Sequence, residues 1–255
     1  ATSPEEVPYL HQLTERGIQN GLTGMKKLSA GELKEYEPHV NGVEGLFVPQ
    51  TGIIDYKEVA AKYAEKFHHF GGEIYTDTEV RGFVEKSPLV EVKTNKQTLV
   101  TRLVVNCTGL HSDTITKMTG IKPDYRIIPF RGEYYKLKPE KEYLVKNLIY
   151  PVPDPNFPFL GVHFTRMIGG GIEAGPNAVL AFRREGYSKT DIHLGELFGS
   201  LTYKGFRTVA KKYWRTGLGE MHRSFSKKAF ATALQKLLPE IQKEDLVKGG
   251  AGVRA

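Results

Sequence analysis

The residues best placed for chemistry lie in a short apolar segment, 161–166, which contains a histidine and ends on an arginine. In an extended strand, His163 and Thr165 point to one face, while Phe164 and Arg166 point to the other. A histidine can act as a general base because its pKa lies near working pH. His163 is therefore a candidate base, and the alternative is a histidine that simply packs within a sheet.

Three arginines stand in apolar or glycine-rich surroundings: Arg131, Arg166 and Arg254. A planar guanidinium binds a carboxylate through two parallel hydrogen bonds, so this setting favours an anionic small-molecule substrate. Arg183 and Arg184 stand beside Glu185, and we expect that pair to form part of a solvated face.

Other conspicuous residues have structural interpretations. Residues 169–174 match G-x-G-x-x-A, but Pro176 follows and no helical pattern does. A dinucleotide motif needs a strand before the glycines and a helix after them, so we expect a hairpin turn. His68 and His69 have no third ligand at metal spacing, so no metal site is predicted. Cys107 follows an apolar run and is expected to be a small buried side chain.

The composition is that of a globular chain with a mild positive charge. Of 255 residues, 40% are hydrophobic and 25% are charged, and 36 Lys and Arg against 29 Asp and Glu give +7. These charges are scattered, which disfavours nucleic-acid binding. The single cysteine excludes an intrachain disulfide and fits a reducing, cytoplasmic compartment. No apolar run approaches the roughly 18 residues of a transmembrane helix.

Local signals predict an α/β pattern over the first half of the chain. Ser29 and Glu32 form a capping box, and Asp55 begins a helix that stops at glycines 71–72. The pattern then predicts a short strand at 74–76 and 80, a hairpin at 90–100, a strand buried on both faces at 103–105, and a helix at 112–118.

The pattern of apolar and polar residues changes after residue 126. Residues 127–185 predict an antiparallel sheet, with strands near 130–137, 160–166 and 172–174, and helices follow at 195–215 and 224–238. The fold class is therefore mixed α/β (α+β), with part of a nucleotide-binding layer followed by a sheet domain with helices.

The chain resembles the L-2-hydroxyglutarate dehydrogenase (oxidase) family, flavoproteins of the D-amino-acid-oxidase-like superfamily. The resemblance runs in order along the chain, in strings such as PFRGEYY and GVHFTR, at residues 47–56, 129–135, 149–155, 161–166, 175–178, 217–221 and 251–255. It implies FAD as cofactor, a partial FAD-binding Rossmann-like layer and an antiparallel-sheet substrate domain.

The family has a glycine-rich N-terminal unit that these residues lack, and a C-terminal segment beyond the last string. Since the chain also begins at Ala1 and stops after a glycine-rich run, we expect a central portion of such an enzyme. The resemblance implies a connecting segment at 1–46, part of the FAD-binding domain at 47–126, the substrate domain at 127–245, and a return to the FAD-binding domain at 246–255.

The resemblance also implies roles for particular residues. Glu79 and Val80 match a segment beside the adenine of FAD, residues Cys107, Thr108 and Gly109 match the turn near its phosphates, and Gly252 and Val253 would contact the cofactor. Arg254 matches the arginine that holds the substrate carboxylate. His163, as the candidate base, would line the pocket together with Arg131, Arg166, Thr51 and Gly52.

The implied reaction is FAD-dependent oxidation of the 2-hydroxy dicarboxylate L-2-hydroxyglutarate to 2-oxoglutarate, with a quinone or oxygen as electron acceptor. The cationic helices at 195–238 would meet an anionic membrane surface or form a plain solvated face. The inner membrane would be that surface, in mitochondria if the source is eukaryotic. The alternatives are a sibling flavin oxidase of an amino acid, secondary amine or glycerol 3-phosphate, and a non-catalytic fragment without flavin.

Overall fold

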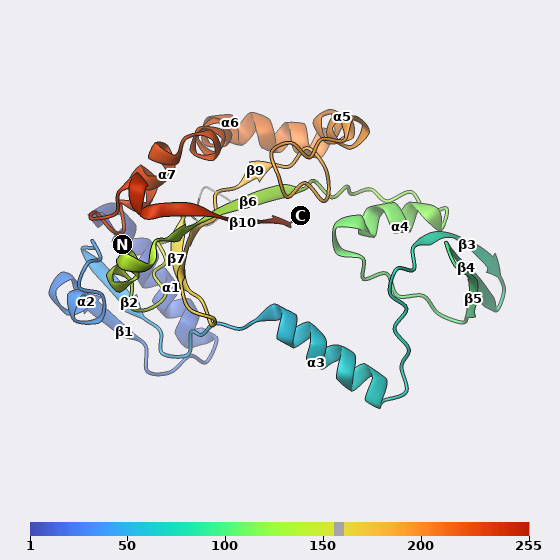
Figure 1. Cartoon of the computed structure of the whole chain (residues 1–255), viewed down its shortest axis with the longest axis horizontal. Helices are drawn as coiled ribbons and strands as arrows, with labels where there is room; N and C mark the ends of the chain where they lie inside the picture. The colour runs from blue at the N-terminus through green and yellow to red at the C-terminus, as the bar shows by residue number, and fades with distance from the viewer. Residues whose placement is uncertain (156–160, 255) are drawn as a thin grey trace. The chain divides into compact units, whose positions relative to one another are not determined.

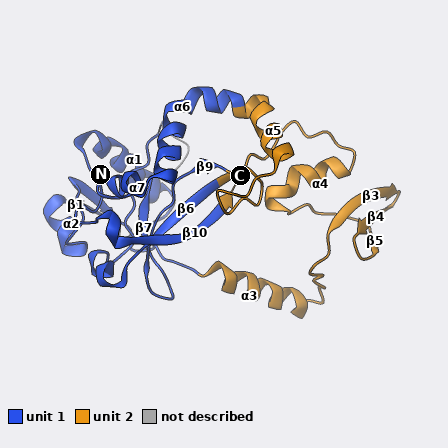
Figure 2. Cartoon of the chain, turned by 45° about the horizontal axis from the view of Figure 1, so that its top comes forward, with its two compact units in different colours: residues 1–54, 131–180, 207–252 blue, residues 55–130, 181–206, 253–255 orange. Residues whose placement is uncertain are grey.

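The computed structural model describes residues 1–155 and 161–254, which form two compact units of mixed helix and strand (Figures 1 and 2). Unit 1 contains residues 1–54, 131–180 and 207–252, and unit 2 contains residues 55–130, 181–206 and 253–255. The strands pair in antiparallel fashion, which confirms the predicted mixed fold class with antiparallel sheets. Leu160, the expected first residue of one strand, lies outside the described residues.

Unit 1 is built on a five-stranded sheet with the order β10-β6-β8-β7, and β9 pairs with β6. A second sheet pairs β1 with β2. The elements are η1 (Pro4–Glu6), α1 (Val7–Gln19), β1 (Lys26–Ser29), α2 (Ala30–Tyr36), β2 (Glu44–Phe47), β6 (Phe130–Leu137), η3 (Pro139–Leu144), β7 (His163–Arg166), β8 (Ile172–Gly175), β9 (Val179–Leu180), α6 (Lys204–Phe225), α7 (Lys227–Leu234), η4 (Lys243–Asp245) and β10 (Leu246–Arg254).

The register of this sheet separates two faces. Ala174 pairs with both Phe164 and Tyr135, and Phe164 and Ala174 are completely buried, so these three side chains define the core face. The opposite face, here called the site face, carries the alternating positions Tyr134, Lys136, His163, Thr165, Glu173 and Gly175. The predicted separation of His163 and Thr165 from Phe164 is therefore confirmed.

Helix α7 covers the core face of the sheet. Its N-cap Ser226 accepts a hydrogen bond from Ala229 N, and Phe230 and Leu234 are fully buried in the core cluster. The Phe230 ring lies 4.7 Å from the ring of Tyr135. Burial of these apolar side chains fixes the sheet, and with it the positions on the site face.

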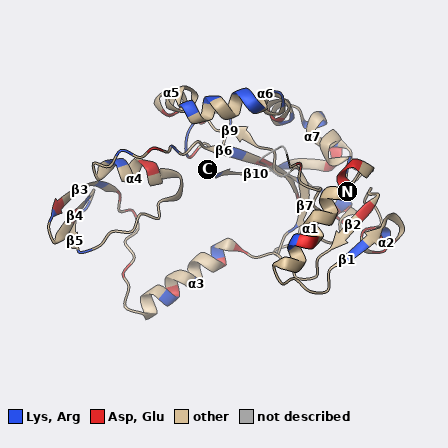
Figure 3. Cartoon of the chain, turned by 180° about the vertical axis from the view of Figure 1, so that it is seen from behind, with Lys and Arg blue, Asp and Glu red and all other residues tan. Residues whose placement is uncertain are grey.

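Helix α6 differs from the prediction of one helix over 195–215. The chain leaves helical geometry at Tyr203, so α5 (Leu194–Thr202) and α6 are separate, and α6 itself is kinked at Tyr213. The buried carboxylate of Glu220 accepts a hydrogen bond from Ala178 N at 3.1 Å, in the segment between β8 and β9. Figure 3 marks in blue the Lys and Arg positions along α6.

Unit 2 holds a three-stranded sheet with the order β3-β4-β5. Its elements are α3 (Tyr56–His69), β3 (Val80–Lys86), β4 (Leu89–Thr94), β5 (Thr98–Thr101), η2 (Gly109–His111), α4 (Ser112–Met118) and α5. The predicted hairpin at 90–100 and the helix at 112–118 are confirmed. Asp55 caps α3 by accepting a hydrogen bond from Lys57 N, as its sequence signal predicts.

Two predicted strands of unit 2 are wrong. Residues 74–76 and 103–105 form no strand, and Leu103 and Val105 are each more than 70% exposed. A strand needs a partner for its backbone hydrogen bonds, and none of the described strands pairs with either segment. Residues 103–105 are apolar, but apolar composition alone does not supply a neighbouring strand.

Among the described residues, no helix combines the length and the hydropathy that would let it span a bilayer.

Candidate functional site

The site face of the unit 1 sheet presents His163 beside positions that have no side chain. His163 pairs with Gly175 on the neighbouring strand, and a Cβ at Gly175 would lie 3.2 Å from Tyr134 Cδ1 and 2.9 Å from Glu133 O. On β10, a Cβ at Gly249 would lie only 2.8 Å from Tyr134 O. Glycine therefore permits close strand packing here, and Gly175 lets its strand lie directly against Tyr134, with no space for a side chain.

The His163 imidazole is held in one orientation. Its ring stacks on the Tyr150 ring with centroids 4.3 Å apart, and its Nδ1 lies 3.3 Å from Gly161 O. Because a carbonyl oxygen only accepts, Nδ1 carries the proton and Nε2 keeps its lone pair. Burial lowers the pKa of His163 below its ordinary value, and the hydrogen bond to Gly161 O only partly opposes that effect. The neutral imidazole is thus the dominant form at neutral pH.

Arg131 lies on the other side of the same sheet. It alternates in phase with Tyr135 on the core face, and only 3% of its surface is exposed. Its Nε and Nη2 donate to Glu133 Oε1 at 3.1 and 3.0 Å, and Asn177 Nδ2 donates to Glu133 Oε2 at 3.0 Å. The structure therefore separates Arg131 from His163 and engages its guanidinium with Glu133.

The remaining predicted substrate residues occupy three different places. Arg166 shares the core-face phase of Phe164, and its Nη1 donates to Val145 O at 3.2 Å. Thr51 and Gly52 lie in an exposed turn, in which Thr51 N donates to Val48 O at 3.2 Å. Arg254 is exposed at the end of β10, after exposed Gly252 and half-buried Val253.

In unit 2, the turn at residues 106–109 is shaped by its own side chains. Asn106 Oδ1 accepts from Thr108 Oγ1 at 2.7 Å, and Asn106 Nδ2 donates to Ser112 O at 2.9 Å. Gly109 has φ +53°, a conformation that favours glycine, and no atom lies within 4 Å of where its Cβ would be. The turn thus offers open backbone.

The prediction that Cys107 is a small buried side chain is wrong. It is exposed, because the apolar segment before it forms no buried strand. Glu79 and Val80 lie at the start of β3, an edge strand of its sheet. Glu79 N donates to Asn95 Oδ1 at 2.9 Å and Glu79 O accepts from Asn95 N at 3.0 Å, so both backbone groups of Glu79 are engaged, while Val80 pairs with Thr94.

Sequence reasoning missed the most deeply buried polar pair of unit 2. Arg184 was expected on a solvated face, but it is 8% exposed, and Asp113 is completely buried. Arg184 Nη1 and Nη2 donate to the two Asp113 carboxylate oxygens at 2.6 and 2.8 Å. Burial opposes ionisation of Asp113, but the hydrogen bonds and charge of Arg184 outweigh it, so the pKa of Asp113 lies below its ordinary value. No local signal links two residues 71 positions apart.

Glycines 169–171 confirm the predicted hairpin turn. Met167 N donates to Gly171 O at 3.0 Å between the antiparallel strands β7 and β8, and Gly170 and Gly171 both have positive φ. Within the described part of the chain, no group of three or more His, Cys, Asp or Glu side chains is placed to hold a metal ion.

Comparison with known proteins gives consistent relatives. The profile of the family described as DAO, FAD dependent oxidoreductase, matches residues 1–255. The chain is 57% identical over its whole length to L-2-hydroxyglutarate dehydrogenase of Indibacter alkaliphilus, of which it covers 64%. It is 42% identical to the mitochondrial L-2-hydroxyglutarate dehydrogenase of Homo sapiens, of which it covers 58%. The chain thus spans less than two thirds of the length of these relatives.

Solved structures share the fold at low sequence identity. An L-α-glycerophosphate oxidase from Mycoplasma pneumoniae superposes with a TM-score of 0.74 at 20% identity, over 100% of this chain and 59% of that chain. An L-proline dehydrogenase from P. horikoshii superposes with a TM-score of 0.68 at 21% identity, over 98% of this chain and 57% of that chain. These similarities concern the fold alone.

Proposed function

Because the chain belongs to the family of FAD-dependent oxidoreductases, we propose that its protein oxidises L-2-hydroxyglutarate to 2-oxoglutarate. The observation that carries this proposal is the 57% identity, over the whole chain, to a relative named L-2-hydroxyglutarate dehydrogenase. Since the chain spans 64% of that relative, the activity is proposed for the full-length gene product.

The residues of unit 2 fit a dinucleotide cofactor. The backbone at Gly109, beside Thr108, can approach phosphate oxygens because no atom lies within 4 Å of where its Cβ would be, and the edge strand β3 at Val80, next to Glu79, can meet an adenine. We assign these residues and Cys107 to the cofactor, together with Gly252 and Val253 on β10. When bound, FAD supplies the acceptor for the hydride that leaves C2 of the substrate.

His163 is the proposed general base. Its Nε2 lone pair accepts the proton of the substrate 2-hydroxyl group, while the C–H electron pair leaves as the hydride. The stacked Tyr150 ring and the hydrogen bond to Gly161 O hold Nε2 in a fixed direction, so the base needs little reorganisation before it takes the proton.

A dicarboxylate substrate requires cationic partners. We propose Arg254, which is exposed at the end of β10, as the residue that binds the carboxylate beside C2. Arg166 and the Thr51–Gly52 turn remain proposed contacts for the rest of the substrate. Arg131 would influence the substrate through its charge and not by direct contact, because Glu133 already accepts two hydrogen bonds from its guanidinium.

The test is the visible absorbance of the purified full-length protein under anaerobic conditions. L-2-hydroxyglutarate should bleach the flavin band, whereas the D enantiomer should not. His163→Gln should keep the flavin but slow bleaching about 100-fold or more, since a positioned base contributes at least that factor. The matched control is His39→Gln, a half-buried histidine that pairs with Glu240 in the same unit.

Either of two results would contradict the proposal. A flavin that bleaches only with an amino acid, a secondary amine or glycerol 3-phosphate would assign the protein to a sibling activity. A protein without any flavin would contradict the redox function itself.

We further propose that electrons pass to a quinone or to oxygen, and that helix α6 contacts an anionic membrane surface. Trp214, Leu218 and Phe225 recur on one side of the helix after the kink and are 55–69% exposed. The Arg215 guanidinium lies over the Trp214 ring at 5.3 Å, so a cation and an apolar ring are presented together. Such a location would be peripheral to the inner membrane, on its cytoplasmic or mitochondrial side.

A further inference from the structure

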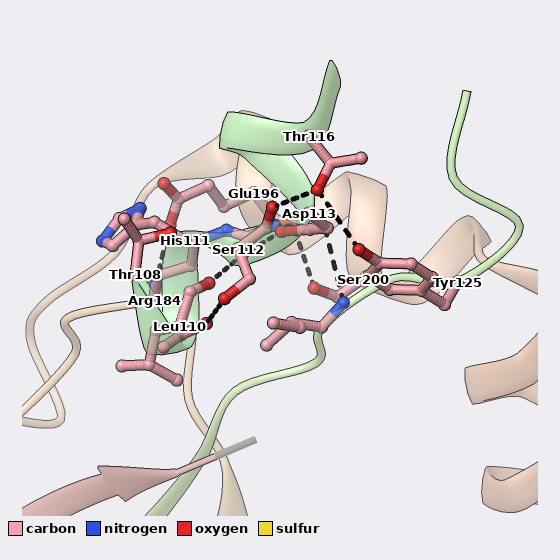
Figure 4. Close-up of polar contacts among 12 residues, drawn as sticks. Thr108, Leu110, His111, Ser112, Asp113, Thr116, Tyr125, Arg184, Glu196 and Ser200 are labelled. Atoms are coloured by element: carbon pink, nitrogen blue, oxygen red, sulfur yellow. Dashed lines mark hydrogen bonds and ion pairs between the residues drawn. The ribbon is translucent and has the colours of Figure 1, made fainter. Parts of the chain in front are cut away.

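The guanidinium of Arg184 has three buried or half-buried acceptors in unit 2 (Figure 4). Two are the carboxylate oxygens of Asp113, and the third is Leu110 O, to which Nη1 also donates. Leu110 belongs to η2, the short 3₁₀ helix that begins at Gly109. Arg184 therefore binds both Leu110, which directly follows the 106–109 turn, and helix α4, which comes after it.

The local contacts of the turn set its shape but do not anchor it. His111 N donates to Thr108 O at 3.0 Å and Ser112 Oγ donates to Gly109 O at 2.7 Å, all within a few residues of each other. Thr108 and Gly109 are themselves exposed. The contact from Arg184 comes from 74 residues farther along the chain, so it fixes where the turn lies within unit 2.

The position of Arg184 is itself fixed by a contact to helix α5. Its backbone N donates to Glu196 Oε2 at 2.7 Å, and Glu196 stands in the first turn of α5, where its own N donates to His193 Nδ1 at 3.2 Å. Asp113 also accepts from Ile127 N at 3.4 Å. These hydrogen bonds thus connect α5, through Arg184, to the 106–109 turn.

We propose that Arg184 is a positioning residue for FAD: it holds the Thr108–Gly109 backbone in the place where that backbone meets the cofactor. It acts through Leu110 and Asp113 and does not itself touch FAD. This inference rests on the proposed function, which assigns the turn to the cofactor. The chemistry requires arginine, because a planar fork can serve a carboxylate and a carbonyl together, whereas a lysine ammonium is a single point charge.

The experiment compares Arg184→Lys and Arg184→Met with the wild type in the full-length protein. After the flavin has been removed, the dissociation constant of FAD is measured by quenching of flavin fluorescence. We expect it to rise on the order of tenfold in Arg184→Lys, which is about 1.4 kcal/mol, and further in Arg184→Met.

Loss of stability alone is separated by a control in the same unit. Val92→Ala removes two methyl groups from a buried position on β4, a strand that contains neither the turn nor α4. It should lower the melting temperature but leave the dissociation constant of FAD unchanged at a temperature well below melting. If Val92→Ala weakens FAD as much as Arg184→Lys does, the positioning role is overturned.

A second readout does not depend on the cofactor. Amide hydrogen exchange at Gly109–His111 should speed up in both Arg184 variants without FAD, but not in Val92→Ala. Unchanged exchange in Arg184→Met would overturn the inference. Failure of the wild type to bind FAD would overturn the proposed function, and faster exchange in that case would still show that Arg184 anchors the turn.

Discussion

In the proposed site, the ring of Tyr150 stacks on the imidazole of His163 and affects its pKa. Burial under the Tyr150 ring lowers the pKa of His163, so the imidazole stays neutral to a lower pH than an exposed histidine would. Activity that needs the neutral form is then retained above this lowered pKa and lost as the pH falls through it. The acid limb of kcat/KM should therefore lie below pH 6.5.

Tyr150→Ala tests this reasoning. Removing the ring exposes the imidazole to water, so the pKa of His163 should rise and the acid limb should move toward about 6.5. The measurement is kcat/KM against pH in the full-length protein. Tyr143→Ala is the control, since its ring meets His39 edge-on at 5.5 Å and leaves His163 covered. An acid limb that stays in place in Tyr150→Ala would remove the ring from this role.

Single residues were predictable from sequence where their neighbours in the chain decide their environment. The face of His163 followed from strand alternation, and the caps at Ser29 and Asp55 followed from residues three positions away or fewer. Arg184 was not predictable, because its environment is created by Asp113 from a distant part of the chain. The same holds for Arg131, since burial of its strand position depends on the core that other segments supply.

At the scale of the elements, helix α7 determines how well the sheet of unit 1 is fixed. Phe230→Ala should lower the free energy of unfolding by about 3–5 kcal/mol, because it empties a completely buried site beside Tyr135. Phe225→Ala should change it by no more than about 0.5 kcal/mol, because that ring is 69% exposed. Denaturant unfolding measures both, and equal losses would mean that α7 does not carry the core.

Elements were predicted well where a local signal ends or begins them. The hairpin turn at 169–171 and the strands around it came from glycine and alternation alone. Residues 103–105 failed because strand formation depends on a pairing partner, which apolar composition cannot reveal. Gly205 follows the break at Tyr203, but glycines also stand inside both helices, so glycine does not mark the break and helix α5 and helix α6 read as one.

At the scale of the whole molecule, each unit is assembled from three separate segments of sequence. The resemblance implies one return to an earlier unit, at 246–255, but composition shifts predict only boundaries along the chain and give no sign of the segment at 181–206. The contacts that close each unit are long-range, and they were the part of the fold that sequence reasoning could not supply.

The proposed membrane contact is a property of the assembled molecule. Sedimentation with anionic vesicles should be strong at low salt, weaken as salt screens the basic residues of α6, and fall at least several-fold in the double variant Trp214→Ala, Leu218→Ala. Ile18→Ala is the matched control, because it removes an equally exposed apolar side chain from α1. Equal binding to neutral vesicles, or no binding at all, would contradict this contact.

The pairing of Arg184 with Asp113 also sets an order of events during synthesis. The ribosome must add 71 residues after Asp113 before Arg184 exists, which takes roughly 4 to 14 s at ordinary elongation rates. Throughout that interval the 106–109 turn has its local shape but no anchor. A slow codon run before residue 184 would lengthen this exposed period, so translation speed in that stretch bears directly on how much nascent chain reaches the folded state.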